Sequence, residues 1–234
     1  MKLAVMQPYF FPYIGYFQLM NAVDEFVVYD NIEYTKKGWI NRNRILVNGQ
    51  PAYVTIPLKN DSDILDVKDR HLASSWPIAR QDMLNRITGA YRKSPYFDIV
   101  RPMVEKCLLF EENNLFSYIL HTLKLTCEYL GIQTRLTVSS AIPIDHSLKA
   151  QRKVIEICRA RNSDEYWNPI GGTALYAKEE FQDQGIALHF LKANDISYRQ
   201  FENAFVPNLS ILDVMMFNSK EEITGFLGPA LGAA

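Results

Sequence analysis

The residue types best suited to binding an anionic small molecule are gathered in segment 34–44, YTKKGWINRNR. Arginine holds a carboxylate or phosphate in a planar fork, asparagine orients polar substrate atoms, and tryptophan offers a flat face for a base or sugar ring. If residues 40–45 are extended, alternate side chains share a face. The alternative is a solvated, charged edge strand. The candidate residues are Lys36, Lys37, Trp39, Asn41, Arg42, Asn43 and Arg44, with Asn41 and Asn43 expected on the face of Ile45 and the two arginines on the other.

A second candidate is segment 8–17, PYFFPYIGYF. Its outline resembles the loop of class I adenylating and nucleotidylyl-transferring enzymes, in which a small residue near the start of the first helix leaves room for the nucleotide. The N-terminus of that helix favours phosphate. Gly15 supplies the small residue, but Tyr13 and Tyr16 stand where those enzymes carry histidines. Tyrosine donates a hydrogen bond without carrying positive charge at neutral pH. The alternative is an aromatic plug, with Gly15 present for close packing.

Two further segments carry weaker indications. Gly171 and Gly172, in NPIGG, permit backbone amides to approach an anion, or simply form a tight turn before a helix. Ser147 is expected to cap the basic helix LKAQRKVIEICRA, whose Arg152 brings positive charge near its start.

Cysteine and histidine give little indication of a metal site. The cysteines Cys107, Cys127 and Cys158 are far apart in apolar helical contexts, which is typical of buried small hydrophobic residues. The histidines have no partner at metal-ligand spacing. Asp145 and His146 are adjacent, but nothing in the pattern makes them face each other.

The elements that position these residues alternate between strand and helix. An apolar strand at 2–6, a helix at 13–23 and a strand at 24–30 predict a βαβ unit with parallel strands and a right-handed crossover. Ligands then bind at the carboxyl ends of the strands, where residues 7–11 and 30–34 are expected side by side. The remaining expected strands are 134–140, 165–169 and 186–191, with helices at 148–160 and 171–181 and near the C-terminus.

Between the second and third of these strands, the pattern differs. Asn48-Gly49 lies between two alternating apolar stretches, which predicts a β-hairpin. Residues 76–130 show helical periodicity and end before Gly131, a suitable C-cap. We therefore expect a single α/β domain over residues 1–234, a Rossmann-like parallel sheet with a hairpin and a helical insert at about 76–131. The final residues, GPALGAA, are expected to fray.

Composition excludes several classes of function. Hydrophobic residues make up 48% and charged residues 22%, and the formal net charge is -1, so no long-range field favours nucleic acid or an anionic membrane. No apolar run approaches the roughly 20 residues that cross a bilayer, and Gln7 and Pro8 interrupt any signal-like segment. The sequence thus predicts a cytoplasmic protein acting on a small molecule, and leaves the formation of a homo-oligomer open.

Five motifs resemble the WbqC-like protein family in content and order, from residue 1 to about 227. They are MQPYFFPYIGYFQLMN, DEFVVYDNIEYTKKGWINRNRI, AYRKSPYF, EYWNPIGG and FVPNLSILDVMMFN. The resemblance implies a role in biosynthesis of O-antigen and related bacterial surface glycans. For some members, attachment of an amino acid, notably glycine, to a nucleotide-linked amino sugar has been proposed.

Combined with the class I outline, the resemblance implies an enzyme of nucleotidylyltransferase or HUP-like fold that uses ATP to activate a carboxylate, which an amine then attacks directly in a ternary complex. Magnesium is expected only with a nucleoside triphosphate. The implied catalytic residues are Tyr13, Tyr16, Lys36 and Arg42. The implied binding residues are Gln7, Tyr9, Gly15, Trp39, Asn41, Asn43 and Arg44, with Gly171 and Gly172 facing the ligand from the opposite loop.

Two other classes stay open. One is a thioester-dependent N-acyltransferase for the same amino sugar, which needs a general base such as His71, His146 or His189. The other is a non-catalytic protein that binds a sugar nucleotide.

Overall fold

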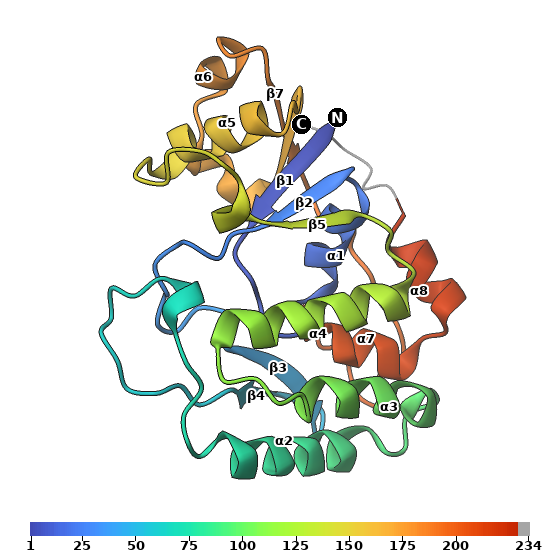
Figure 1. Ribbon diagram of the computed structural model, residues 1–234. Coiled ribbons are helices and arrows are strands. Elements are labelled where there is room, and N and C mark those ends of the chain that lie inside the picture. Colours follow the sequence, from blue (N-terminus) through green and yellow to red (C-terminus); the bar gives the residue numbers. More distant parts are fainter. Residues whose placement is uncertain (229–234) are drawn as a thin grey trace.

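The computed structural model describes residues 1–228 and is built on a five-stranded sheet with the order β5-β2-β1-β6-β7 (Figure 1). Every neighbouring pair of strands is parallel. The chain first adds strands on one side of β1 and then crosses to the other, so the strand order reverses between β1 and β6. In open α/β sheets, ligands bind beyond the carboxyl ends of the strands at such a point. The strands are β1 (Lys2–Met6), β2 (Glu25–Val28), β5 (Arg135–Val138), β6 (Glu165–Pro169) and β7 (Ala187–Leu191).

Side-chain alternation along the central strands creates two hydrophobic cores, one on each face of the sheet. Leu3 and Val5 of β1 face one core, and Ala4 faces the other. Helix α1 (Ile14–Asn21) packs on the face of the sheet to which Ala4 points. Helix α5 (Ala150–Ala160) packs on the opposite face, to which Leu3 and Val5 point. Because both faces are covered, the central strands carry consecutive buried apolar residues, at 3–5 in β1 and 26–28 in β2.

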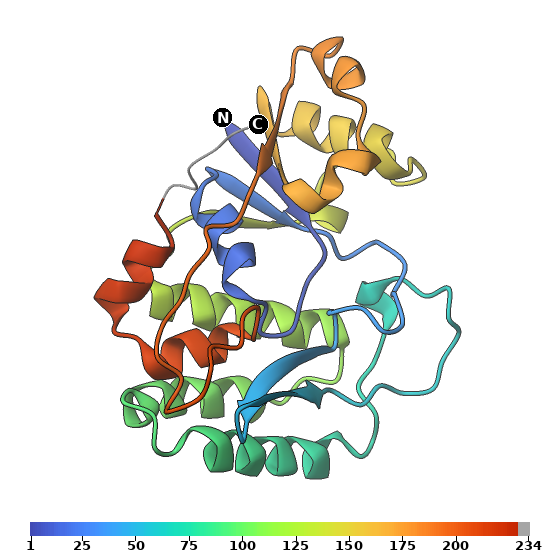
Figure 2. The same ribbon diagram turned by 180° about the vertical axis from the view of Figure 1, so that it is seen from behind.

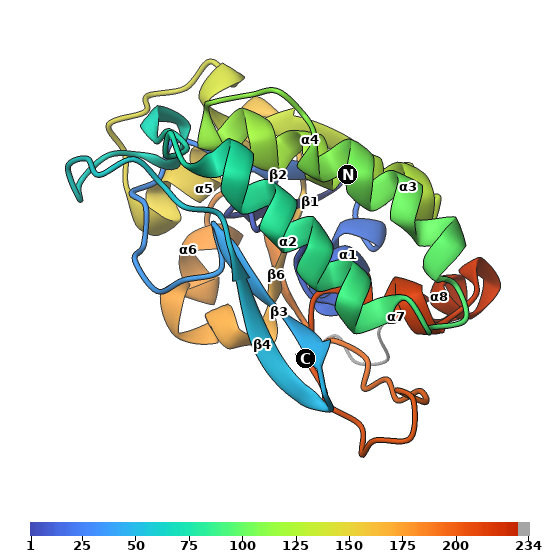
Figure 3. The same ribbon diagram turned by 90° about the horizontal axis from the view of Figure 1, so that it is seen from below.

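The hairpin and the helical insert lie between β2 and β5 in the chain. Strands β3 (Arg42–Val47) and β4 (Gln50–Thr55) are antiparallel, and Asn48 and Gly49 at the turn both have positive φ, 52° and 75°. The helices are α2 (Trp76–Tyr91), α3 (Phe97–Leu108) and α4 (Leu115–Leu130). The hairpin lies beside α2 (Figure 3), and both contribute to the core that α1 shares with the sheet. Gly131 ends α4 in the left-handed conformation, as predicted.

The segment after β7 returns from the sheet to the hairpin (Figure 2). There the backbone N–H of Ser210 donates to the carbonyl of Arg44 at 2.8 Å, and that of Ile211 donates to the carbonyl of Pro12 at 2.9 Å. Helices α7 (Ile211–Phe217) and α8 (Lys220–Phe226) follow. Residues more than 150 positions further along the chain thus lie directly against the hairpin.

Two local predictions are wrong. The glycine pair does not open an α-helix: residues Ile170–Leu175 form a 3-10 helix, and α6 (Lys178–Gln182) starts only after an extended break. The turn needs glycine at position 172, because a Cβ there would lie 2.0 Å from Oδ1 of Asn168. Ser147 does not cap α5 either, because its hydroxyl donates to Asp145 at 2.7 Å.

The remaining expected strands, the hairpin, the helical middle and the burial of all three cysteines are confirmed. Residues 229–234, most of the segment expected to fray, lie outside the described part of the chain. Within residues 1–228, no helix has the length and apolar character needed to cross a membrane.

Candidate functional site

A pocket of about 290 Å³ lies where the loop after β1, the start of β3 and the returning segment meet. Five of the residues that the sequence singled out line it, together with one from the returning segment. They are Tyr9, Tyr13, Trp39, Asn43 and Arg44, joined by Asn208. The pocket therefore has aromatic walls and a guanidinium group, which suits a polar, anionic ligand with a flat ring.

Arg44 is the cation of this pocket. Its guanidinium carbon lies 5.3 Å from the ring centre of Trp39, and one terminal nitrogen donates to the carbonyl of Asn208 at 3.2 Å. Its Nε is buried and has no hydrogen-bond partner among residues 1–228. An unpaired buried donor is costly, roughly 1–3 kcal/mol, unless a bound group satisfies it. The guanidinium of Arg44 therefore has hydrogen-bonding capacity that the described residues leave unused.

Arg42 has a different role. Its guanidinium lies 4.7 Å from the ring centre of Tyr53, and that ring stacks on Trp39 at 6.2 Å. Its Nε donates to the carbonyl of Gly38 at 3.0 Å, and a second bond reaches the carbonyl of Lys37. Arg42 thus holds the turn that carries Trp39, and outside the pocket it extends the stack of rings and cations that begins at Arg44.

Asn41 and Asn43 lie on the buried face of the hairpin with Ile45, as the alternation predicted. The amide nitrogen of Asn43 donates to the carbonyls of Phe10 and Phe11, at 3.2 and 2.9 Å. The side chain of Asn41 accepts a hydrogen bond from the hydroxyl of Tyr34 and donates one to the carbonyl of Ile56, the residue after β4, both at 2.8 Å. The side-chain amide nitrogens of both residues already donate to backbone carbonyls of the protein. These residues therefore shape the pocket by fixing the backbone around it.

The start of α1 is covered by Tyr13. A Cβ on Gly15 would lie 2.4 Å from Cε2 of Tyr13, so the absence of a side chain makes room for this ring. Tyr16 is 1% exposed and packs against Phe26, and its hydroxyl donates to the carbonyl of Gln7 at 3.0 Å. Burial raises the pKa of Tyr16 well above its ordinary value. Tyr13 faces the pocket, and Tyr16 lies in the core.

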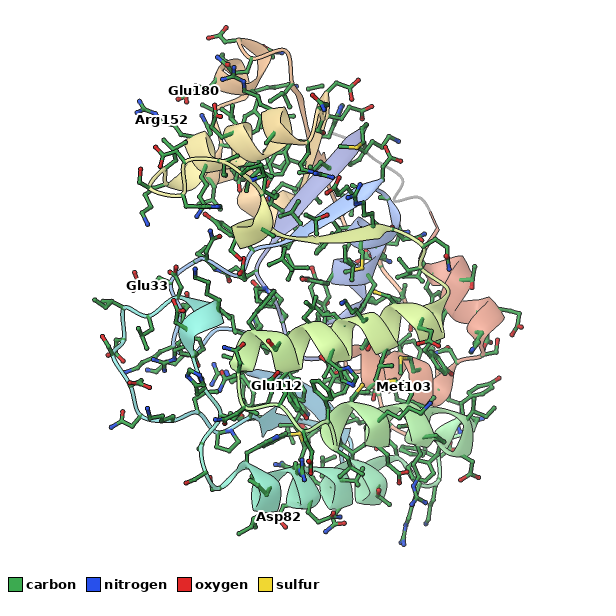
Figure 4. The ribbon with its side chains drawn as sticks, in the orientation of Figure 1. Glu33, Asp82, Met103, Glu112, Arg152 and Glu180 are labelled. Atoms are coloured by element: carbon green, nitrogen blue, oxygen red, sulfur yellow. The ribbon has the colours of Figure 1, made fainter. Side chains whose placement is uncertain are left out.

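Other predicted residues lie elsewhere. Lys36 is exposed and forms an ion pair with Asp63 at 2.7 Å. Gly171 and Gly172 follow β6, and neither lines the pocket. Arg152 lies on the α5 side of the molecule, and with Glu180 it borders an open groove of about 520 Å³ (Figure 4).

The sequence analysis missed a polar cluster at the carboxyl ends of β2 and β5. Asp30 is 2% exposed and accepts bonds from the hydroxyls of Ser139 and Ser140. Lys153 of α5 is also 2% exposed, and its Nζ donates to the carbonyl of Asn31 at 3.2 Å. Burial lowers the pKa of Lys153. The available signal was the helical period, which places Lys153 four residues before Ile157 on the apolar face of α5.

None of the three candidate bases lies at the pocket. His71 is exposed, Nδ1 of His146 lies 2.9 Å from the amide nitrogen of Asn31, and His189 stacks on Trp167 with ring centres 4.7 Å apart. Within residues 1–228, no three histidine, cysteine, aspartate or glutamate residues gather in a way that could hold a metal ion.

Comparisons with known proteins agree with the motifs. Residues 7–224 match the WbqC-like protein family. The chain is 28% identical to the uncharacterized protein Rv1507c of Mycobacterium tuberculosis, and the alignment covers 97% of each chain. No solved structure matches it. Because the family match spans most of the sequence, including every residue that lines the pocket, the chain belongs to the WbqC-like protein family.

Proposed function

We propose that this protein is an enzyme of bacterial surface-polysaccharide biosynthesis that transfers an amino acid such as glycine to an amino group of a nucleotide-linked amino sugar. Family membership supports the polysaccharide role. The observation that carries the proposal is the pocket around Arg44, in which an unpartnered buried guanidinium nitrogen lies among aromatic rings. A pyrophosphate beside the guanidinium and a base or sugar against Trp39 and Tyr9 would match that surface.

The sheet supports a nucleotide substrate. Numbered within the parallel sheet alone, the strand order is 3-2-1-4-5, the order that begins the doubly wound dinucleotide-binding fold. We therefore propose a Rossmann-like, HUP-like classification. The loop after β1, which carries Tyr9 and Tyr13, leaves the sheet beside the point at which the strand order reverses.

ATP is the proposed source of activation. The amino acid carboxylate would attack the α-phosphorus of ATP, releasing pyrophosphate and leaving an aminoacyl adenylate. The sugar amine would then attack the carbonyl carbon, so that an amide forms, AMP leaves and the amine loses a proton. Arg44 fits the phosphate groups of such a substrate. No carboxylate lines the pocket, so magnesium would arrive with the triphosphate and keep mainly phosphate and water ligands.

Thioester-dependent acyl transfer is less well supported. It requires a general base within reach of the reacting amine, and the pocket lining contains no histidine. A carrier that binds sugar nucleotide without turnover would use the same pocket, and only kinetics separates it from the enzyme.

Calorimetric titration with UDP-glucosamine and with magnesium ATP tests the proposal. We expect micromolar binding, at least tenfold weaker in Arg44→Ala and unchanged in the matched surface variant Arg101→Ala, since Arg101 pairs with Glu105 on the exposed side of α3. Pyrophosphate release over many turnovers that requires both glycine and the amino sugar would support the ligase, because the enzyme turns over only when the amine consumes the adenylate. Binding without release would favour the carrier, and no binding of either nucleotide would overturn the proposed site.

A further inference from the structure

A second, smaller compartment adjoins the Arg44 pocket. Its volume is about 110 Å³, and it shares Tyr13 and Asn208 with the larger pocket. Its remaining walls come from α1, α7 and the returning segment. Because they share these two residues, the two compartments are direct neighbours.

The smaller compartment has the opposite charge. Its lining contains one ionisable carboxylate, Asp195, and no lysine, arginine or histidine. Asp195 is exposed and has no ion pair within residues 1–228. The rings of Tyr198 and Phe205 pack edge to face, 5.1 Å apart, in the same lining. A carboxylate beside aromatic rings is a favourable environment for an ammonium group.

The walls of this compartment are well anchored. Next to Asp195, the backbone N–H of Asn194 donates to the side chain of Gln18 at 3.1 Å. The hydroxyl of Tyr198 donates to Asp213 at 2.7 Å, and Asp213 is fully buried. The backbone next to Asp195 and the ring of Tyr198 are therefore held in place before a ligand binds, which reduces the entropic cost of binding.

We propose that the Asp195 compartment binds the ammonium group of a ligand whose anionic part is held by Arg44. The compartment, of about 110 Å³, has room for an ammonium group on the edge of a sugar ring. This inference rests on the proposed function, because it assigns the amine of the same nucleotide-linked amino sugar.

The test compares sugar nucleotides that differ only in the amine. Calorimetric dissociation constants are measured for UDP-glucosamine and UDP-glucose, and for a matched pair with an amino or hydroxyl group at carbon 4. In at least one pair, the wild-type protein should bind the amine about tenfold more tightly, the gain typical of one charge-assisted hydrogen bond. In Asp195→Asn this preference should disappear, while the affinity for the hydroxyl sugar stays within about twofold.

The control is Asp183→Asn, which removes an equal charge from an exposed position after α6 and should preserve the preference. Thermal unfolding of each variant verifies that the chain is folded. Equal binding of amine and hydroxyl sugars in both pairs, or a preference that survives Asp195→Asn, would overturn the Asp195 assignment while the Arg44 site stands. If no sugar nucleotide binds the wild-type protein, or if Arg44→Ala binds all of them normally, the proposed function itself fails.

Discussion

The amide nitrogen of Asn43 donates a hydrogen bond of 2.9 Å to the carbonyl oxygen of Phe11. Phe11 has a φ of 42°, a left-handed conformation that is unfavourable for a residue with a bulky side chain. Ser210 donates to the same carbonyl at 2.9 Å. Three segments distant in sequence thus meet at one strained residue, which lies in the loop that forms the pocket wall.

Replacing Asn43 should damage stability and binding together. Asn43→Ala leaves the carbonyl of Phe10 without this donor inside the core, which should lower the free energy of unfolding by about 1–3 kcal/mol. The loop then loses its attachment to β3, and affinity for sugar nucleotide should fall. Urea denaturation and calorimetry measure the two effects. Asn85→Ala is the control and should change stability by less than about 0.5 kcal/mol, because the Asn85 side chain is exposed and accepts a hydrogen bond from Gln81 at the surface of α2.

Gly15→Ala should displace the ring of Tyr13. The added Cβ would lie 2.4 Å from Cε2, so the ring must rotate away from α1. Because Tyr13 lines both compartments, ligand affinity should change even though Gly15 lines neither. In a double-mutant cycle with Tyr13→Ala, which removes the obstructing ring, we expect a coupling of about 0.5–3 kcal/mol. Additive effects of the two substitutions would contradict this account.

Gly89→Ala is the matched control for that experiment. Gly89 lies near the C-terminal end of α2, and a Cβ there meets no atom within 4 Å. Alanine is the better helix former, so this variant should gain about 0.5–1 kcal/mol without affecting binding.

Arg161 should matter far more than its neighbour Arg159. Glu25 is 1% exposed in β2 and receives two bonds from Arg161, at 2.9 and 3.1 Å. Arg161→Ala leaves that carboxylate buried with only Thr137 as a side-chain donor, so we expect a loss of about 3 kcal/mol in urea unfolding. Arg159 pairs with Glu156 at the surface, and Arg159→Ala should cost less than about 1 kcal/mol. Similar losses in the two variants would show that the buried pair is not a significant anchor.

Asp213 should make stability decrease as pH rises above about 4. Burial raises the pKa of this carboxyl, and hydrogen bonds from Tyr198, Gln200 and Tyr91 partly oppose the increase. The folded protein therefore retains the proton to a higher pH than the unfolded chain, whose aspartate pKa is about 3.9. Between those two pKa values the folded state binds more protons, so the contribution of Asp213 to stability is lost as pH rises through the folded pKa.

The measurement is the difference in unfolding free energy between the wild type and Asp213→Asn at several pH values from 4 to 7. As pH increases, the unfolding free energy of the wild type should fall relative to that of the variant. Asp82→Asn, an exposed carboxylate on α2 (Figure 4), controls for general charge effects. A difference that stays constant, or moves in the wild type's favour as pH rises, would contradict the shifted pKa of Asp213.

Local sequence patterns were sufficient for most elements. The alternation at 40–45 correctly predicted that Asn41 and Asn43 share the face of Ile45, and Asn48-Gly49 correctly predicted the hairpin turn. Such features are decided within a few residues, because a turn that needs positive φ or a strand with one apolar face depends only on neighbours in the chain. The glycine pair at 171–172 misled the prediction, because adjacent glycines permit a 3-10 turn as readily as a helix start and the close approach of Gly172 to Asn168 is not visible in the spacing.

The sequence by itself determined the strands, the hairpin, the helical insert, the family and the segment that carries Arg44 and Trp39. Only the tertiary structure decided which of the candidates meet in one pocket. In the folded protein Tyr16 lies in the core and Lys36 lies at the surface, so neither lines the pocket. It also brought Asn208 and Asp195 beside Tyr13 from the far end of the chain. The physical reason is that a binding pocket is made of contacts between distant segments, whose packing depends on burying the whole apolar core and cannot be read from the spacing within any one segment.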